Sequence, residues 1–401
     1  MKILMLTPYL PYPLLSGGQI RTYNLLKNLS QKHKITLFAL TKDKSERQYL
    51  PELEKFCRKV RIFERTFSPW HIKNILRAGF TTFPFLVTRN LVDETKKAVE
   101  KEISENKYDL IHAETFYMMP NIPKTKIPVI LVEQTIEDMV YQSYALKSKI
   151  WPLKPLFFVD IQKIKYWEKF YWKSCSYLIT MSEEDKQYIL SVVPTIRNID
   201  VVANGVDSQW FAQVKKKLPS RPTILSVGTF RWLPNIEAVE FLVEKIWTLI
   251  KKRIPKAKLW IVGNNPTPKI YSYEQKDSSV KVTGGIPDIR DAYAGAHVLL
   301  APVFSGKGTR YKILEALATG TPIVATSTAL EGLNILPGKQ ALVANTANDM
   351  AEAVYRILSD NKLQKSLSEN GKKFVYENYD WKIISKKLDS IYQRVGSHEE
   401  N

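Results

Sequence analysis

The feature that most constrains the fold is a regular alternation of short apolar runs with longer amphipathic runs. The first apolar run, 2–7, is followed by helical spacing over 19–30 and by a second apolar run at 34–40. Strands of a parallel sheet are buried on both faces, so they read as near-continuous hydrophobic runs. Further strand-like runs lie at 59–63, 109–113, 129–132, 177–180 and 200–202, with helical patterns between them, notably at 93–105, 159–173 and 183–190. The first two hundred residues therefore predict a doubly wound α/β domain.

The alternation breaks at 208–221, a polar and basic segment with Pro219 near its end and Pro222 directly after it, and then restarts. The second set of strand-like runs is 223–227, 258–262, 280–283, 297–301 and 322–325, with helical patterns at 234–252 and 287–293. A chain of 401 residues is long enough for two domains. We predict Rossmann-like domains at 1–207 and 222–379, joined by a linker at 208–221. We expect the last helix, about 380–401, to pack back on the first domain, and the two domains to face each other across a ligand cleft.

Composition narrows the class of protein. The 44% hydrophobic and 25% charged content fits a folded protein, and no apolar run reaches the roughly 18 residues that span a bilayer. The start has no secretory signal pattern, which predicts a cytoplasmic location. Cys57 and Cys175 show no metal or disulfide spacing. The net charge of +19 is spread over both halves and favours a polyanionic partner. Because no nucleic-acid module signature accompanies it, we expect an anionic membrane surface and no nucleic acid.

A glycine loop followed by a helix start, Ser305 to Leu317, is the strongest candidate site. Glycines at 306 and 308 allow an anion to approach the backbone, and the first N–H groups of a helix have no partner inside the helix. Lys307, Arg310 and Lys312 add positive charge. A phosphate suits this loop, whereas the carboxylate of Glu315 suits a ribose diol. An ordinary surface helix after a glycine turn is the alternative.

Other glycines follow predicted strands, at Gly17-Gly18, Gly228, Gly263 and Gly284-Gly285. Open α/β sheets bind ligands at the carboxyl ends of their strands, where Arg231 also lies, and a guanidinium suits a diphosphate. Ordinary turns would explain each glycine alone, and a solvated loop would explain the arginine. The histidines are scattered, and the sequence shows neither a metal-binding pattern nor a Ser/His/Asp triad. We therefore expect the chemistry to rest on positive charge that stabilises a leaving group.

Taken together, the motifs resemble the retaining glycosyltransferases of family 4, which have the two-Rossmann-domain GT-B fold. The motifs that carry the resemblance are Gly17-Gly18, Asn204-Gly205-Val206-Asp207, 228–235 (GTFRWLPN), 259–263 (LWIVG), 282–288 (VTGGIPD), 306–316 and 319–324 (TGTPIV). In this order and spacing they are specific. The resemblance implies a nucleotide-sugar donor, a glycan or lipid-linked acceptor, and no cofactor or metal.

The resemblance assigns roles position by position. It implies donor contacts at Gly17, Gly18, Gly228, Arg231, Gly263, Gly284, Gly285, Ile286, Gly306, Lys307, Gly308, Thr309, Arg310 and Glu315. Glu315 matches the ribose-binding glutamate, and Gly284 to Ile286 match the turn beside the nucleobase. Arg231, with Lys307 and Lys312, would act in catalysis by stabilising the leaving phosphate. The implied mechanism is front-face substitution, in which that phosphate accepts the acceptor's proton.

Three positions depart from the family pattern. Lys307 stands where many members have a first glutamate, and Pro234 where a lysine is usual. Glu133-Gln134 stands where many have a histidine near the donor sugar, so Gln134 is expected to replace it as a hydrogen-bonding group, with Glu133 and His112 as further candidate sugar or acceptor contacts. A non-catalytic relative that binds nucleotide-sugars remains an alternative. An epimerase would need carboxylates and a histidine in the cleft, and a nucleic-acid-binding protein would leave Glu315 unexplained.

Two stretches of the first domain mix basic and aromatic residues, at 68–85 and at 149–172. This mixture is typical of segments that bind a membrane interface or a lipid-linked acceptor. Helix packing within the domain would explain it as well. We expect the protein at the inner face of the cell membrane, engaged in the synthesis of a cell-surface polysaccharide or glycolipid.

Overall fold

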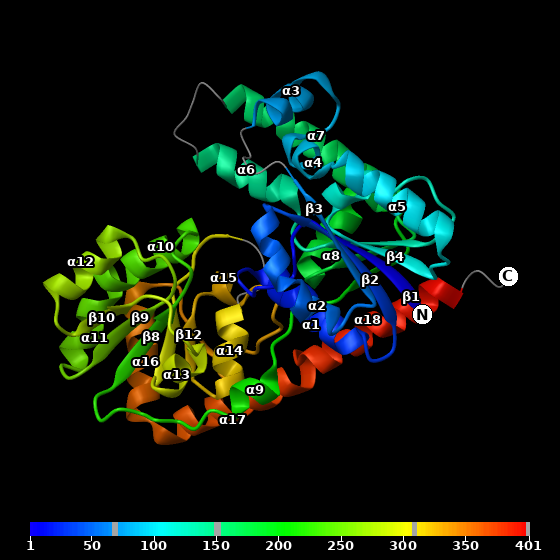
Figure 1. The fold of residues 1–401 in the computed structure, drawn as a ribbon. Helices are drawn as coiled ribbons and strands as arrows, with labels where there is room; N and C mark the ends of the chain where they lie inside the picture. The colour runs from blue at the N-terminus through cyan, green and yellow to red at the C-terminus, as the bar shows by residue number, and fades with distance from the viewer. Residues whose placement is uncertain (66–70, 148–153, 307–310, 398–401) are drawn as a thin grey trace. The chain divides into compact units, whose positions relative to one another are not determined.

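A computed structural model describes residues 1–65, 71–147, 154–306 and 311–397 (Figure 1). The chain divides into two compact units, the first made of Met1–Ala203 with Ile384–Asn401 and the second of Asn204–Ile383. Each unit has its own parallel sheet. The second boundary falls inside a helix, α18 (Trp381–Gly396), rather than at its start.

The first unit is built on seven parallel strands in the order β3-β2-β1-β4-β5-β6-β7. The strands are β1 (Lys2–Thr7), β2 (Lys34–Thr41), β3 (Lys59–Glu64), β4 (Leu110–Glu114), β5 (Val129–Glu133), β6 (Tyr177–Thr180) and β7 (Ile199–Val201). Ile3 of β1 pairs with Ile35 on one side and Leu110 on the other. These central strands are buried on both faces, which explains why their sequences are continuously apolar. The doubly wound arrangement predicted from the sequence is confirmed.

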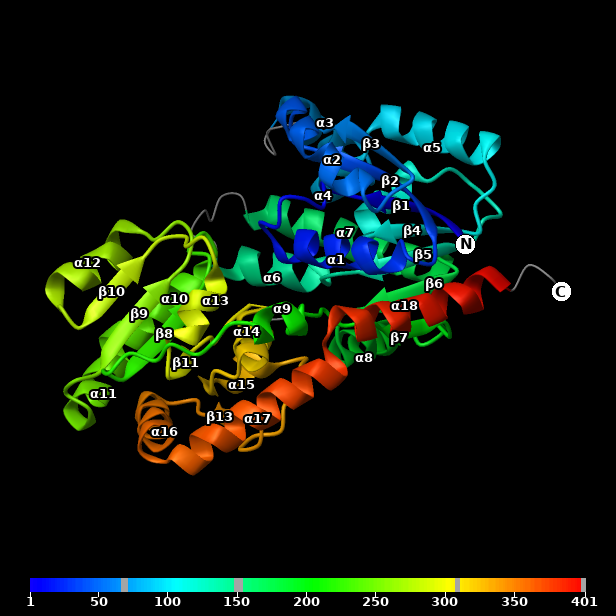
Figure 2. The same cartoon turned by 60° about the horizontal axis from the view of Figure 1, so that its bottom comes forward.

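Helices cover both faces of this sheet (Figure 2). They are α1 (Gly17–Leu29), α2 (Leu50–Glu54), α3 (Ile72–Phe80), α4 (Phe85–Asn90), α5 (Asp93–Glu105), α6 (Glu137–Lys147), α7 (Lys154–Ser174) and α8 (Glu183–Val192), with 3-10 turns at Lys44–Tyr49 and Phe116–Asn121. Gly17 and Gly18 form the first turn of α1, whereas the sequence predicted helical spacing only from residue 19. Ser16 caps this helix by accepting from the N–H of Gln19.

The second unit holds six parallel strands in the order β10-β9-β8-β11-β12-β13. They are β8 (Thr223–Val227), β9 (Lys258–Val262), β10 (Val280–Thr283), β11 (Val298–Ala301), β12 (Ile323–Ala325) and β13 (Leu342–Val343). Its helices are α9 (Ser208–Ala212), α10 (Leu233–Phe241), α11 (Trp247–Arg253), α12 (Pro268–Lys276), α13 (Ile289–Ala294), α14 (Tyr311–Thr319), α15 (Ser327–Leu330), α16 (Ala347–Ser359) and α17 (Asn361–Asn378). A π-helical stretch, Leu242–Ile246, joins α10 to α11. The segment expected to be a linker, 208–221, begins with the helix α9 instead.

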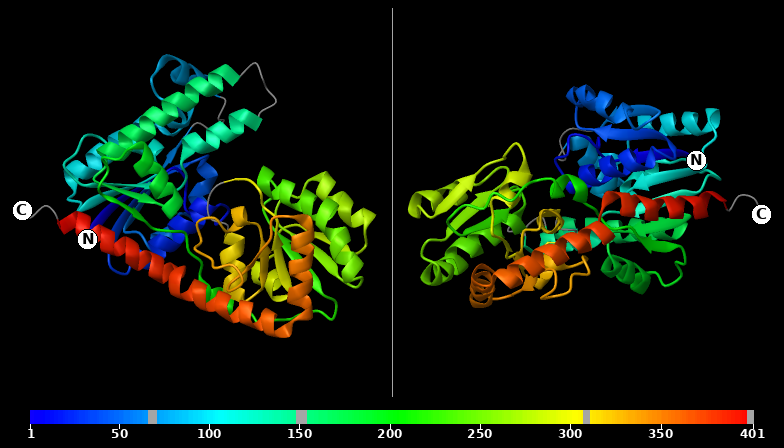
Figure 3. Two further views of the ribbon diagram at one scale, coloured as in Figure 1. Left: turned by 180° about the vertical axis from the view of Figure 1, so that it is seen from behind. Right: turned by 90° about the horizontal axis from the view of Figure 1, so that it is seen from below.

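The end of α18 packs on the first unit. Asp389 accepts from His33 Nε2 at 2.9 Å, and the guanidinium of Arg394 contacts Asp200 at 2.6 Å. The two views of Figure 3 show this end of the helix beside the N-terminus of the chain. Across the described residues, no helix is both long and apolar enough to cross a membrane.

Candidate functional site

In the second unit, the carboxyl ends of β8, β9 and β10 are joined by backbone hydrogen bonds. The N–H of Gly228 donates to Val262 O, and the N–H of Gly263 donates to Thr283 O, each at 3.1 Å. Gly263 has φ of +150°, and a Cβ there would lie 1.6 Å from the Gly228 carbonyl oxygen. Only glycine fits this position, and it brings two of the predicted donor glycines into direct contact.

In the turn after β10, Gly285 is crowded by a neighbouring side chain and Gly284 is not. A Cβ on Gly285 would meet Asn264 Oδ1 at 2.1 Å, whereas a Cβ on Gly284 would meet its nearest neighbour, Tyr271, at 3.8 Å. Ile286 is half-buried. Gly263 is therefore needed for packing whether or not a ligand binds, a side chain at Gly285 would require Asn264 to move, and Gly284 is not explained by crowding.

The loop after β8 is tied to helix α14. Lys312 Nζ donates to Asn235 Oδ1 at 2.9 Å, and Asn235 Nδ2 donates to Thr229 O at 3.0 Å. Arg231 lies exposed in this loop, and its guanidinium has no hydrogen-bond or ion-pair partner among the residues that the structure covers. Lys312 thus helps to hold the loop that carries Arg231.

Glu315 lies half-buried on α14. Its Oε2 accepts from the hydroxyl of the buried Tyr293 at 2.7 Å. Loss of hydration raises the pKa of the Glu315 carboxyl, against the opposing effects of the Tyr293 hydrogen bond and the Lys312 charge. Within the described part of the chain, no group donates a hydrogen bond to Oε1 of Glu315. Tyr293 therefore orients the carboxylate and leaves one oxygen available to a ligand.

The loop between β11 and α14 is described only at its ends. Gly306 has φ of +90°, a conformation that favours glycine. Ser305 Oγ donates to Glu237 Oε2 at 3.0 Å. Four predicted donor contacts, Lys307, Gly308, Thr309 and Arg310, lie outside the described residues.

In the first unit, Gln134 lies against the first turn of α1. A Cβ on Gly18 would be 2.7 Å from Gln134 Oε1 and 2.7 Å from the Tyr9 hydroxyl. Gln134 Nε2 donates both to that hydroxyl and to Glu114 Oε2, the latter at 2.6 Å. Both amide protons are therefore used, and the amide oxygen is the atom with capacity left for a ligand hydroxyl.

A buried polar network holds Gln134 in this orientation. Glu114 Oε1 lies 3.1 Å from His112 Nε2, and His112 Nδ1 lies 2.6 Å from the Tyr392 hydroxyl of α18. Burial alone would raise the pKa of the Glu114 carboxyl, but the interactions with His112 and Arg21 and the Gln134 hydrogen bond lower it. Glu114, Arg21 and Tyr392 were not among the predicted residues. The pattern His112-x-Glu114 on one strand was the available signal, since alternate strand residues share a face.

Two predicted sugar or acceptor contacts, His112 and Glu133, are interior residues. His112 is fully buried, and both of its nitrogens have partners within the first unit. Glu133 is also buried and accepts from Trp172 Nε1 at 2.8 Å. Burial raises the pKa of the Glu133 carboxyl to about 8, and the Glu137 charge adds to this effect. The structure thus places both side chains in the interior of the first unit, and a ligand contact through either of them stays a prediction.

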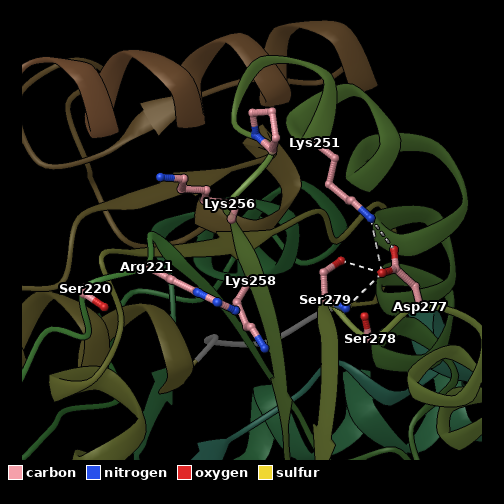
Figure 4. Close-up of a pocket in the computed structure, with 10 residues that line it drawn as sticks. Ser220, Arg221, Lys251, Lys256, Lys258, Asp277, Ser278 and Ser279 are labelled. Atoms are coloured by element: carbon pink, nitrogen blue, oxygen red, sulfur yellow. Dashed lines mark hydrogen bonds and ion pairs between the residues drawn. The ribbon is translucent and has the colours of Figure 1, made fainter.

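A basic cavity of about 600 Å³ lies near the amino ends of β8, β9 and β10, at the opposite end of these strands from Gly228, Gly263 and Gly284. Figure 4 shows its lining side chains, with Lys251 and Ser279 both directed at Asp277. Its other charged residues are Arg221, Lys256 and Lys258. None of the predicted donor contacts lines this cavity, so it is separate from the glycine-bearing strand ends.

Two family models match this chain. The model described as "Glycosyltransferase Family 4" matches residues 15–210, and the one described as "Glycosyl transferases group 1" matches residues 221–360. The chain belongs to glycosyltransferase family 4. The resemblance inferred from the glycine motifs and Glu315 is therefore confirmed at the level of the family.

Two relatives match most of this chain. An "Uncharacterized 44.6 kDa protein in cps region" of Klebsiella pneumoniae is 22% identical over 96% of this chain and 97% of its own. The "Phosphatidyl-myo-inositol mannosyltransferase" of Mycolicibacterium smegmatis is 23% identical over 75% of each chain.

Two solved structures share the fold. A sucrose-phosphate synthase from Thermosynechococcus elongatus has a TM-score of 0.73 at 18% identity, covering 100% of both chains. HepE from Anabaena, solved in complex with UDP, has a TM-score of 0.67 at 15% identity, covering 98% of this chain and 100% of its own. Both units thus have the parallel α/β architecture of GT-B glycosyltransferases, as predicted.

Proposed function

We propose that this glycosyltransferase transfers a sugar from a nucleoside diphosphate sugar to a glycan or lipid-linked acceptor, with retention of anomeric configuration and without a metal ion. The observation that carries the donor class is the Glu315 carboxylate, oriented by Tyr293. A carboxylate oxygen can accept hydrogen bonds from the two hydroxyls of a ribose. UDP is the first nucleotide to test, since UDP is bound in the HepE structure.

The proposed reaction needs positive charge more than an acid–base pair. The bond between the sugar's anomeric carbon and the diphosphate breaks, and the acceptor oxygen bonds to that carbon on the same face. The acceptor's proton passes to the leaving phosphate. Arg231 would stabilise that phosphate, while Lys312 holds the Arg231 loop through Asn235. The amide oxygen of Gln134 is proposed to accept a hydrogen bond from a sugar hydroxyl.

The acceptor is proposed from two different observations. The mycobacterial relative is a mannosyltransferase that acts on phosphatidyl-myo-inositol by its name, and the present chain carries a net charge of +19. Both favour an acceptor at an anionic lipid surface, and we propose the inner face of the cell membrane as the place of action. The Klebsiella relative, named for its cps region, is consistent with polysaccharide synthesis.

A thermal-shift panel of UDP-, GDP- and ADP-sugars tests the donor class. We expect one nucleotide class to stabilise the wild type, and both Glu315→Ala and Arg231→Ala to lose most of that shift. Glu369→Ala and Arg356→Ala, on α17 and α16 of the same unit, are controls for lost charge and should respond like the wild type. If the Glu315 and Arg231 variants respond like the wild type, the assigned site is wrong.

Turnover separates an enzyme from a non-catalytic relative. With the nucleotide class known, labelled donor is incubated with glycan and lipid extracts, with and without EDTA. We expect labelled product in both conditions and, by NMR, the donor's anomeric configuration in that product. Binding without any product would favour the non-catalytic alternative.

A further inference from the structure

Helix α3 presents its apolar face to solvent. Ile72, Ile75, Leu76 and Phe80 are 61%, 42%, 49% and 87% exposed, while the polar Asn74 is buried. Their spacing of three and four residues places the four on one side of the helix. A helix on a protein core normally has the reverse orientation, with its apolar side inward. The outward face therefore needs a partner outside this unit's core.

The C-terminal end of α3 is bonded to α7. Lys163 Nζ donates to Ala78 O at 2.6 Å and to Thr81 O at 2.9 Å, which satisfies carbonyl groups at the C-terminal end of α3. At the start of the helix, His71 Nδ1 accepts from Lys73 N–H at 3.3 Å. The exposed side chains thus belong to a helix that is capped at both ends and held against its neighbour.

The apolar surface continues along α7. Leu156, Val159, Tyr166 and Phe170 are exposed and, with Lys163, follow one stripe of this helix at intervals of three or four residues. Lys163 lies on that stripe and bonds to the carbonyls of Ala78 and Thr81, so the stripe reaches the end of α3 that carries Phe80. We call the two sets of exposed side chains the α3/α7 face: Ile72, Ile75, Leu76 and Phe80 of α3 with Leu156, Val159, Tyr166 and Phe170 of α7.

Most charges around the α3/α7 face are positive. Helix α3 carries Lys73 and Arg77 and no acidic residue; Arg77 lies 3.5 Å from the exposed Asp93 at the start of α5, and Lys73 has no acidic neighbour on its own helix. Helix α7 has two acidic residues, and both serve internal contacts. Asp160 accepts from Phe85 N–H at 2.8 Å, and Glu168 accepts from Glu137 N–H at 2.7 Å. Lys169 and Lys173 are exposed near the stripe.

We infer that the α3/α7 face docks on an anionic lipid bilayer, with its apolar side chains in the interface and its cations on the lipid headgroups. A second copy of this chain fits the face less well. In a symmetric dimer the same patch meets itself, which would bring cations against cations. The inference adds a defined surface to the proposed action at a membrane, and its test measures binding and does not depend on sugar transfer.

Vesicle sedimentation of the full chain tests this surface. Vesicles that mix phosphatidylglycerol with phosphatidylethanolamine are compared with vesicles of phosphatidylcholine alone. We expect the wild type to bind the anionic vesicles and to bind less as salt is raised. The double variant Leu76→Ser with Phe80→Ser should bind at least about tenfold more weakly, because two large apolar groups are removed from the interface.

A matched control uses exposed apolar residues of the second unit, Leu336→Ser with Tyr376→Ser, which are 55% and 58% exposed. This control should bind like the wild type, and unchanged melting temperatures would show that both double variants fold. A wild type that fails to bind anionic vesicles at low salt would overturn the inference. So would a Leu76/Phe80 variant that binds as well as the wild type, or lipid-free dimerisation that this variant abolishes.

Discussion

At the residue scale, Tyr293 is expected to matter through Glu315. Its hydroxyl donates to Glu315 Oε2 at 2.7 Å from a fully buried position. Tyr293→Phe removes this donor, so the carboxylate is oriented less well and its pKa rises further. We expect nucleotide affinity to fall about 3- to 10-fold, in line with the loss of one hydrogen bond. Isothermal titration with the nucleotide identified by thermal shift measures the change. An unaltered affinity would mean that Tyr293 does not position Glu315 for binding.

The contact between Gly263 and Gly228 gives a stability prediction. Gly263→Ala would place a Cβ 1.6 Å from the Gly228 carbonyl oxygen, at φ of +150°. We expect a loss of roughly 3 kcal/mol or more in unfolding free energy, because backbone has to move. Gly338→Ala is the control: it also has positive φ, +79°, but nothing lies within 4 Å of its Cβ. Chemical denaturation should show a clearly smaller loss for the control, and equal losses would rule out the steric explanation.

At the element scale, the buried carboxyls at the end of β5 and on α6 and α7 are expected to make stability depend on pH. Glu168 of α7 caps α6 by accepting from the N–H groups of Glu137 and Asp138. Burial raises the pKa of Glu133 to about 8 and that of Glu137 to about 7. A carboxyl with a raised pKa in the folded state binds its proton more tightly there than in the unfolded chain. Stability from these groups is therefore present near the ordinary carboxyl pKa and is lost as pH rises toward 8.

Glu133→Gln should weaken this pH dependence. The variant cannot ionise, and its amide oxygen can still accept from Trp172 Nε1, which Glu133 contacts at 2.8 Å. Relative to the wild type, we expect it to gain stability from pH 5 to pH 8 by at least about 1 kcal/mol, since one pKa unit corresponds to about 1.4 kcal/mol. Urea unfolding at a series of pH values measures this gain. Parallel curves for the two proteins would contradict it.

The elements themselves were largely predictable from the sequence. Strands at 177–180, 223–227, 258–262 and 280–283 match β6, β8, β9 and β10 residue for residue. Continuous apolar runs between turn residues are a strong local signal. Strand β13 was missed because it is only Leu342–Val343, too short to form a pattern. Helix α9 was missed because its five residues lie in a segment whose polarity and prolines resemble a linker.

The candidate site was predictable only in part. Glu315 follows a local motif, so its place on α14 could be expected. The network under Gln134 joins His112 to Tyr392, which are 280 positions apart, and no local pattern connects them. The sequence also could not show that Glu133 and His112 are interior, since a residue near a strand end can face either the core or solvent.

At the scale of the whole molecule, the two family models match different parts of the chain, one largely in each unit. The proposed donor contacts also come from both units. The second unit supplies Glu315 and Arg231, and the first supplies Gln134. If both units serve one reaction, Gln134→Ala should lower kcat about 10- to 100-fold with little effect on nucleotide binding, since its oxygen would contact the sugar alone. Steady-state kinetics with the identified donor checks this. If Gln134→Ala weakened nucleotide binding as well as kcat, Gln134 would contact the nucleotide instead.

The most direct test of nucleotide-sugar transfer is the incorporation of labelled sugar into an acceptor extract by wild type and Glu315→Ala. We predict that the wild type incorporates label from one nucleotide class and that Glu315→Ala lowers kcat/KM about 10- to 100-fold, as expected for a lost hydrogen bond to a charged group. Glu369→Ala should match the wild type. Incorporation by Glu315→Ala equal to that of the wild type would contradict the assigned site, and no incorporation from any donor would contradict the proposed activity.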